Sequence, residues 1–238
     1  MKNIRTITMI ALLLAIAAGT KGQVRRDRAE KASDKNEILT GKEQLERDRV
    51  ELREFRLLVD AYHQALSARQ LKKIRESEKA LVKAMKRELL QNRRKTGQDS
   101  REAKRGGAER ASSARDIRQS RRDLAAPGHD PGDVRDLRDD RRDRRDDRRD
   151  QRDDVQDLKS RSYRLKQQQD LHDQFVKATV GAKGEEQQQD IRKILASFTG
   201  TMEADIAATK AEIGEDRREL REDRRETRED RRERRERR

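Results

Sequence analysis

Apolar residues recur once per heptad along the first half of the chain, and polar residues fill the positions between them. Leu45, Leu52, Val59 and Leu66 follow this spacing. Residues seven apart lie on the same face of an α-helix, so the pattern predicts an amphipathic helix. A second apolar stripe follows along the chain, and it consists of Leu71, Ile74, Leu81, Val82, Met85 and Leu89.

The second half of the chain repeats this pattern, which indicates an internal duplication. The sharpest match has the form Leu-x-Asp-x-aromatic-x-x-Ala. A chance alignment of two helices with similar periodicity is the alternative interpretation. The aligned pairs are Leu58 with Leu171, Asp60 with Asp173, Tyr62 with Phe175, Ala65 with Ala178, Met85 with Phe198 and Leu89 with Met202.

Each copy is predicted to fold as a helical hairpin. In the second copy, two glycines within residues 181–184 separate the stripes and favour a helix end with a chain reversal. The first copy is expected to turn at residues 67–70, where no glycine stands, so a continuous helix is the alternative there. Thr40 and Glu43 have the spacing of a capping box, which predicts that the first helix begins at Thr40.

Glycine and proline divide the chain further. Gly106 and Gly107 predict one helix break, and two Pro and two Gly within residues 125–132 predict another. The expected organisation is a signal peptide at 1–22, a flexible segment at 23–39, a first hairpin at 40–105, a linker with a short helix at 106–132 and a second hairpin at 133–238.

Charged heptads extend both arms of the second hairpin. Residues 133–154 contain nine Arg and ten Asp, and residues 215–238 repeat Glu and Arg in a similar way. At about 100° per residue, the acids fall on one face of each helix and the arginines on the opposite face. Such a helix gains most by packing on another of its kind, which predicts that residues 133–154 lie beside residues 210–231. A solvated charged tail is the alternative.

The composition excludes most fold classes. Charged residues make up 46% of the chain, hydrophobic residues 30% and aromatic residues 2%. An average domain is about half apolar and a quarter charged. The scarcity of β-branched and aromatic residues argues against strands. The expected fold is therefore all-α, with long coiled-coil-like helical hairpins in two duplicated units, charged helical extensions and flexible linkers.

Residues 1–22 have the anatomy of a secretory signal peptide. Lys2 and Arg5 precede an apolar run of about a dozen residues, and small residues at Thr20 and Gly22 form a cleavage site. The run is shorter than the roughly 20 residues that span a bilayer, although an uncleaved membrane anchor is the alternative. The chain has no Cys, which fits an oxidising compartment. The mature protein is therefore expected to be secreted or periplasmic.

Positive charge is concentrated in the first copy. Residues 69–105 hold fourteen Lys or Arg against five Asp or Glu, which predicts a basic helix that attracts anionic lipid, polysaccharide or nucleic acid. A solvated basic face without a ligand is the alternative. The candidate basic binding surface consists of Arg69, Lys72, Lys73, Lys79, Lys83, Lys86, Arg87, Arg93, Arg94 and Lys95.

The sequence contains no motif for catalysis, for a metal or for a cofactor. His63, His129 and His172 are far apart and lack the spacing of metal ligands, and no phosphate-binding loop or nucleophile motif is present. Three Phe and two Tyr provide no stacking platform for single strands, so no specific nucleic-acid readout is expected. The expectation is a protein that is not an enzyme and has no cofactor.

Residues 39–44, Leu-Thr-Gly-Lys-Glu-Gln, resemble the LTxxQ motif of the Spy/CpxP group of periplasmic helical chaperones, with one extra residue. The second copy lacks an equivalent, and the Arg/Asp heptads are foreign to that family. The resemblance implies ATP-independent binding of unfolded proteins on a positively charged concave helical surface. The basic helix of residues 69–105 would supply that surface.

The leading hypothesis is an exported, non-enzymatic helical protein that binds other macromolecules as a chaperone or an envelope scaffold. Its partner would be a protein client or an envelope component. The alternatives are an electrostatic binder of anionic lipid, polysaccharide or nucleic acid, and a structural coiled coil that assembles into homo-oligomers.

The signal peptide makes a direct prediction about the mature protein. Cleavage after Gly22 should leave Gln23 as the first residue, because the small residues at positions 20 and 22 suit signal peptidase. N-terminal sequencing of the exported protein would detect this end. Exported protein that retains Met1 would contradict cleavage and favour the uncleaved anchor.

Overall fold

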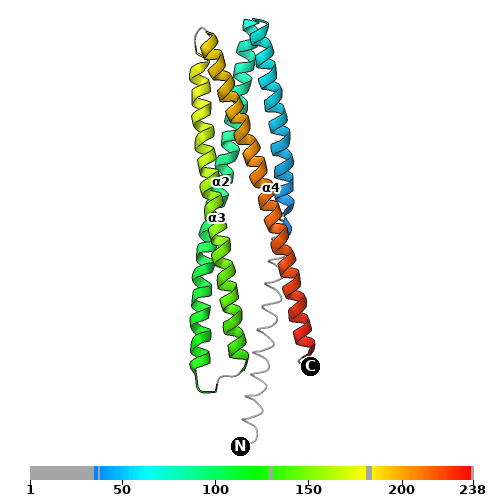
Figure 1. The fold of residues 1–238 in the computed structure, drawn as a ribbon, viewed down its shortest axis with the longest axis vertical. Helices are drawn as coiled ribbons and strands as arrows, with labels where there is room; N and C mark the ends of the chain where they lie inside the picture. The colour runs from blue at the N-terminus through cyan, green and yellow to red at the C-terminus, as the bar shows by residue number, and fades with distance from the viewer. Residues whose placement is uncertain (1–34, 37, 129–130, 181–183, 237–238) are drawn as a thin grey trace, which may run out of the picture. The chain divides into compact units, whose positions relative to one another are not determined.

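The computed structural model describes residues 35–36, 38–128, 131–180 and 184–236, and all regular structure in this part of the chain is α-helical. The prediction of an all-α fold is therefore confirmed. Its helices are the first helix, residues 38–67, followed by α2 (Leu71–Ala125), α3 (Pro131–Ala178) and α4 (Glu185–Glu236) (Figure 1). The predicted signal peptide and residues 23–34 lie outside the described residues.

The chain divides into two compact units, one of which spans Glu54–Thr201. Aromatic rings form the centre of this unit. Phe55 packs against Phe198 with ring centroids 5.2 Å apart, and Tyr62 packs against Phe175 at 6.5 Å. The surrounding buried residues come from both predicted apolar stripes and from their counterparts in the second copy: Ile74, Leu81, Met85, Leu89, Ile191, Ile194 and Leu195.

The other unit contains the start of the first helix and the later part of α4. An ideal Cβ at Gly41 would lie 2.9 Å from Cγ1 of Ile213, so glycine permits a close approach at this point. The buried residues of this unit are Ile38, Leu45, Asp48, Leu52, Met202, Asp205, Thr209, Ile213 and Leu220.

The first helix begins earlier than the capping-box pattern predicted. Residues 35, 36, 38 and 39 are already helical. The predicted flexible segment, residues 23–39, therefore extends too far along the chain. The reason is that Ile38 is buried, one heptad before Leu45 in the same stripe. Thr40 therefore lies inside the helix and does not cap it.

The first hairpin turns at residues 68–70, and the continuous-helix alternative does not occur. Arg69 adopts φ = 53°, a left-handed conformation that usually belongs to glycine. The Arg69 amide donates to the Leu66 carbonyl and the Gln70 amide to the Ala65 carbonyl, as in a Schellman motif. An arginine at the usual glycine position explains why the sequence gave no clear turn signal here.

Helix α2 continues through the predicted linker. Gly106, Gly107, Ser112 and Ser113 are all helical, and α2 ends only at Ala125. The predicted break and short linker helix are therefore wrong. The physical reason is that α3 packs along this part of α2, which overrides the weak helix propensity of glycine. The chain then turns at residues 126–128, where Gly128 has φ = 95°.

Helices α2 and α3 lie side by side as a long antiparallel hairpin (Figure 1). Some Asp residues of the charged heptads at residues 133–154 therefore face α2. The expectation that the acidic stripe of residues 133–154 also packs on residues 210–231 stays a prediction, because those residues belong to the other compact unit. Helix α3 ends at Ala178 and α4 begins at Glu185, and most of the second predicted turn, residues 181–183, lies outside the described residues.

The aromatic core makes a prediction about stability. Replacing Phe198 by Ala should lower the free energy of unfolding by about 3–5 kcal/mol, because the ring is fully buried and its removal leaves a cavity. Urea unfolding followed by circular dichroism would measure the change. Leu57 is 69% exposed and gives the matched control, since Leu57→Ala should change stability by no more than about 0.5 kcal/mol. Equal effects of the two variants would contradict the position of the core.

Candidate functional site

A polar ladder joins α2 to α3 along the half of the hairpin that is rich in charge. From each pair to the next, the position moves seven residues forward along α2 and seven residues back along α3, because the two helices are antiparallel. Asn92 donates to Gln168 at 2.8 Å, which is the contact nearest the aromatic core. The remaining pairs, from the core toward the turn at residues 126–128, are Asp99 with Arg161, Gly106 with Asp154, Ser113 with Asp147 and Ser120 with Asp140.

The ladder explains which acids of the charged heptads are turned inward. Asp140 and Asp147 accept hydrogen bonds from the hydroxyls of Ser120 and Ser113. At the next step Gly106 leaves room for the carboxylate of Asp154, since an ideal Cβ there would lie 3.0 Å from its Oδ2. Small or hydroxyl-bearing residues on α2 therefore accommodate the first Asp of successive α3 heptads.

The packed carboxylates hold their protons more tightly than usual. Burial, together with neighbouring acids such as Glu102 and Asp150, raises the pKa of Asp154 to about 6. Burial and the charges of Asp140 and other acids raise the pKa of Asp143 as well. The acidic groups of this hairpin thus lie close to one another.

The predicted basic surface lies on the first half of α2. Six of its members, Lys72, Lys73, Lys79, Lys83, Lys86 and Arg94, are exposed α2 side chains. On a helix, Lys79, Lys83, Lys86 and Arg94 fall on one face at spacings of three, four and eight residues. This face also carries Leu90, which is 56% exposed.

The other four predicted residues have additional roles. Arg69 lies in the turn before α2. Arg87 is 3.6 Å from a carboxylate oxygen of Glu54, and Arg93 donates to Gln169 on α3 at 3.2 Å. Lys95 is half-buried. The structure thus gathers most of the predicted surface on one helix, and it uses part of that surface to join α2 to its neighbours.

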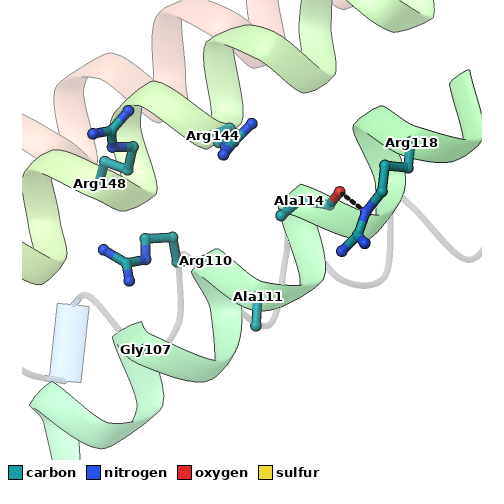
Figure 2. Close-up of a pocket in the computed structure, with 7 residues that line it drawn as sticks. All are labelled: Gly107, Arg110, Ala111, Ala114, Arg118, Arg144 and Arg148. Atoms are coloured by element: carbon teal, nitrogen blue, oxygen red, sulfur yellow. Dashed lines mark hydrogen bonds between the residues drawn. The ribbon is translucent and has the colours of Figure 1, made fainter. Parts of the chain in front are cut away.

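A second basic surface lies farther along the hairpin, and the sequence analysis did not identify it. A hollow of about 530 Å³ is lined by residues of both helices. Figure 2 shows Arg144 and Arg148 of α3 across from the α2 residues that line it. A second hollow of about 500 Å³ shares these two arginines. We call the combined surface the arginine groove, and its charged lining is Arg110, Arg118, Arg121, Arg138, Arg141, Arg144, Arg145 and Arg148.

The sequence does contain a signal for the groove. Gly107, Ala111 and Ala114 follow one another at helical spacing on α2, and all three line the first hollow. Such small side chains leave space beside a partner helix. The sequence alone did not show that α3 is that partner, so these residues were interpreted as a helix break and a linker.

Two of the three histidines, His63 and His172, lie within the described residues, and they are far apart in the chain. His63 is half-buried, and burial with the nearby Arg192 guanidinium lowers its pKa. Nδ1 of His172 lies 2.9 Å from a carboxylate oxygen of Asp173, and His129 lies outside the described residues. Within the described ranges, no three His, Asp or Glu side chains are grouped as metal ligands would be.

None of the described helices combines the length and the apolar character needed to cross a membrane. Comparisons of the chain with protein-family models, with curated proteins and with solved structures gave no match. The function must therefore be inferred from the surfaces themselves.

The raised pKa of Asp154 makes a prediction about pH. Its pKa of about 6 in the folded protein exceeds its ordinary value of 3.8. As the pH falls, this carboxyl is therefore protonated in the folded state before it is protonated in the unfolded state. The resulting stability is present below about pH 4 and is lost as the pH rises toward 6. Asp154→Asn should therefore be more stable than the wild type at pH 7.5 and should lose that advantage at pH 4.5.

Urea midpoints followed by circular dichroism at the two pH values would measure this difference. Asp170→Asn removes an exposed carboxylate from the same helix and serves as the control. If the difference in urea midpoint between Asp154→Asn and the wild type is the same at both pH values, this carboxyl does not titrate between pH 4.5 and 7.5 in the folded hairpin.

Proposed function

We propose that this chain is an exported, non-enzymatic protein that binds partly unfolded client proteins through the basic face of α2. The observation that carries the proposal is the exposed cluster of Lys79, Lys83, Lys86 and Arg94 around the exposed side chain of Leu90. An unfolded chain presents carboxylates and apolar side chains together. A surface that offers cations beside an apolar group is complementary to both.

The chemistry of lysine suits weak binding of varied clients. Its ammonium group is a hydrated point charge on a flexible stem, so it imposes little geometry on its partner. Exposed ion pairs contribute only about 0–1 kcal/mol each, so many of them together allow attachment and release without ATP. The resemblance of residues 39–44 to the Spy/CpxP motif points to the same function, and the export pattern of residues 1–22 supports a place outside the cytoplasm.

A second candidate function is electrostatic binding of an anionic polymer on the same face. It is favoured by the predominance of lysine, because attraction to a polyanion needs charge density but no apolar contact. The two candidates differ in their dependence on Leu90 and on salt. Binding to a polyanion weakens steeply with ionic strength, since the Debye length falls from about 10 Å at 0.1 M to about 3 Å at 1 M.

Suppression of aggregation tests the leading candidate. A reduced and aggregating client protein would be followed by light scattering with the wild type, with Leu90→Ser and with the combined variant Lys79→Gln, Lys83→Gln and Arg94→Gln. Both variants should suppress aggregation less than the wild type, because each removes one component of the surface.

The matched control combines Lys159→Gln, Lys166→Gln and Lys177→Gln, which removes the same charge from exposed positions of α3. It should retain full suppression. An anionic polysaccharide bound equally by wild type and Leu90→Ser, without any suppression of aggregation, would favour the second candidate. Wild-type suppression that both α2 variants retain would contradict the proposed surface.

A further inference from the structure

The arginine groove differs in chemistry from the lysine-rich face of α2. All eight charged residues that line it are arginines, three from α2 and five from α3. The guanidinium group is planar and offers paired donors that match two oxygens of one oxyanion. The groove is therefore suited to directed recognition, whereas the lysine face provides diffuse charge.

Acids of α3 that face α2 bond to serines of that helix and not to the arginines of the groove. Asp140 and Asp147 accept hydrogen bonds from serines of α2. Among the residues that the structure describes, no ion pair joins a groove arginine to an acid. Arg118 and Arg145 each donate a hydrogen bond from Nε to a backbone carbonyl of their own helix.

The same packing concentrates like charges. Arg141 with Arg145, and Arg144 with Arg148, are neighbours one turn apart on α3, and such pairs repel each other. Arg144 and Arg148 also line both hollows, so they lie at the centre of the groove. A bound anion would relieve this repulsion and occupy the unused Nη donors.

The size of the groove favours a compact ligand with high charge density. Each hollow of about 500 Å³ falls within the usual range for small-ligand sites. The stretch of α3 from Arg138 to Arg148 extends about 15 Å, so several anionic groups in a row fit beside it. A terminal phosphate carries about −1.5 to −2 charges and three acceptor oxygens, whereas a carboxylate carries one charge and two oxygens. Clustered phosphates therefore satisfy more guanidinium donors within the same volume.

We propose that the arginine groove between α2 and α3 binds a row of phosphate groups, supplied by a soluble oligophosphate or by adjacent phosphomonoester headgroups of phospholipids. This site is distinct from the α2 face proposed to bind clients, because the two surfaces share no residue. It gives the protein a second ligand that its client binding does not require.

Calorimetry with inorganic tripolyphosphate on the mature full-length chain tests the site. Combining Arg144→Gln with Arg148→Gln should raise the dissociation constant for tripolyphosphate about tenfold or more, because two charge-assisted bidentate contacts are lost. The control combines Arg142→Gln with Arg152→Gln, which removes the same charge from exposed α3 residues outside the groove lining. The dissociation constant of this control variant should stay within about twofold of the wild-type value. Helical content by circular dichroism would verify that both variants fold.

Vesicles that contain phosphatidic acid, whose headgroup is a phosphomonoester, distinguish the two sources of phosphate. Flotation that requires Arg144 and Arg148, without binding of tripolyphosphate, would assign the groove to lipid headgroups. The reverse result would assign it to a soluble oligophosphate, and either result supports the site.

Three outcomes would overturn the proposal. Equal weakening by the groove and control variants would show diffuse attraction only. Tetraglutamate bound as tightly as tripolyphosphate would remove the selectivity for phosphate. A wild type that self-associates through Arg144 and Arg148 while binding neither phosphate probe would identify the occupant as the acids of a second copy.

Discussion

The antiparallel register between α2 and α3 is the constraint on which the rest of the hairpin depends. It brings residues one heptad apart on α2 against residues one heptad apart on α3. Near the aromatic core the pairing includes Asn92 with Gln168, both of which are buried. A slip of one heptad would place Asn92 against Phe175 in one direction or Asp99 against Asp154 in the other, and an unsatisfied buried polar group costs about 1–3 kcal/mol. The ladder therefore specifies the register even where few apolar residues are available.

The ion pair of Asp99 with Arg161 illustrates how this specification works. Both side chains are about nine-tenths buried. Removing water from two charges offsets much of their attraction, so such a pair adds little net stability. Removing one partner, however, leaves a buried charge and typically costs about 3–5 kcal/mol. The pair thus disfavours wrong registers more than it stabilises the correct one.

Sequence reasoning predicted the helices well and their partners poorly. Heptad spacing predicted the apolar stripes, and the core residues Phe55, Tyr62, Ile194 and Phe198 all belong to segments that were predicted to be helical. The choice of partner for the charged tract depended on contacts that no local pattern contains. Acidic and basic faces alone suggested an oppositely charged helix. The structure presents serines and a glycine of α2 to three of these acids, because hydroxyls can donate to carboxylates and glycine makes room for one.

The same limit explains the partial success for the basic surfaces. An excess of charge along one segment is visible in the sequence, so the lysine-rich face of α2 was predicted. The arginine groove was not, because residues 133–154 contain nine Arg against ten Asp and are close to neutral as a segment. Only the fold sorts these charges, by directing the first Asp of successive heptads toward α2.

This sorting has a consequence for the two basic surfaces. The lysines of α2 lie on an open helix face, where flexible stems must be ordered each time a ligand binds. The groove arginines are carried by two helices whose register is specified by the polar ladder, so the backbone positions of these arginines are set before a ligand arrives, and only their exposed side chains must be ordered. Preorganisation lowers the entropic cost of binding and raises selectivity. The two proposed surfaces therefore differ in construction, and the difference follows from which half of α2 is packed against the acidic heptads of α3.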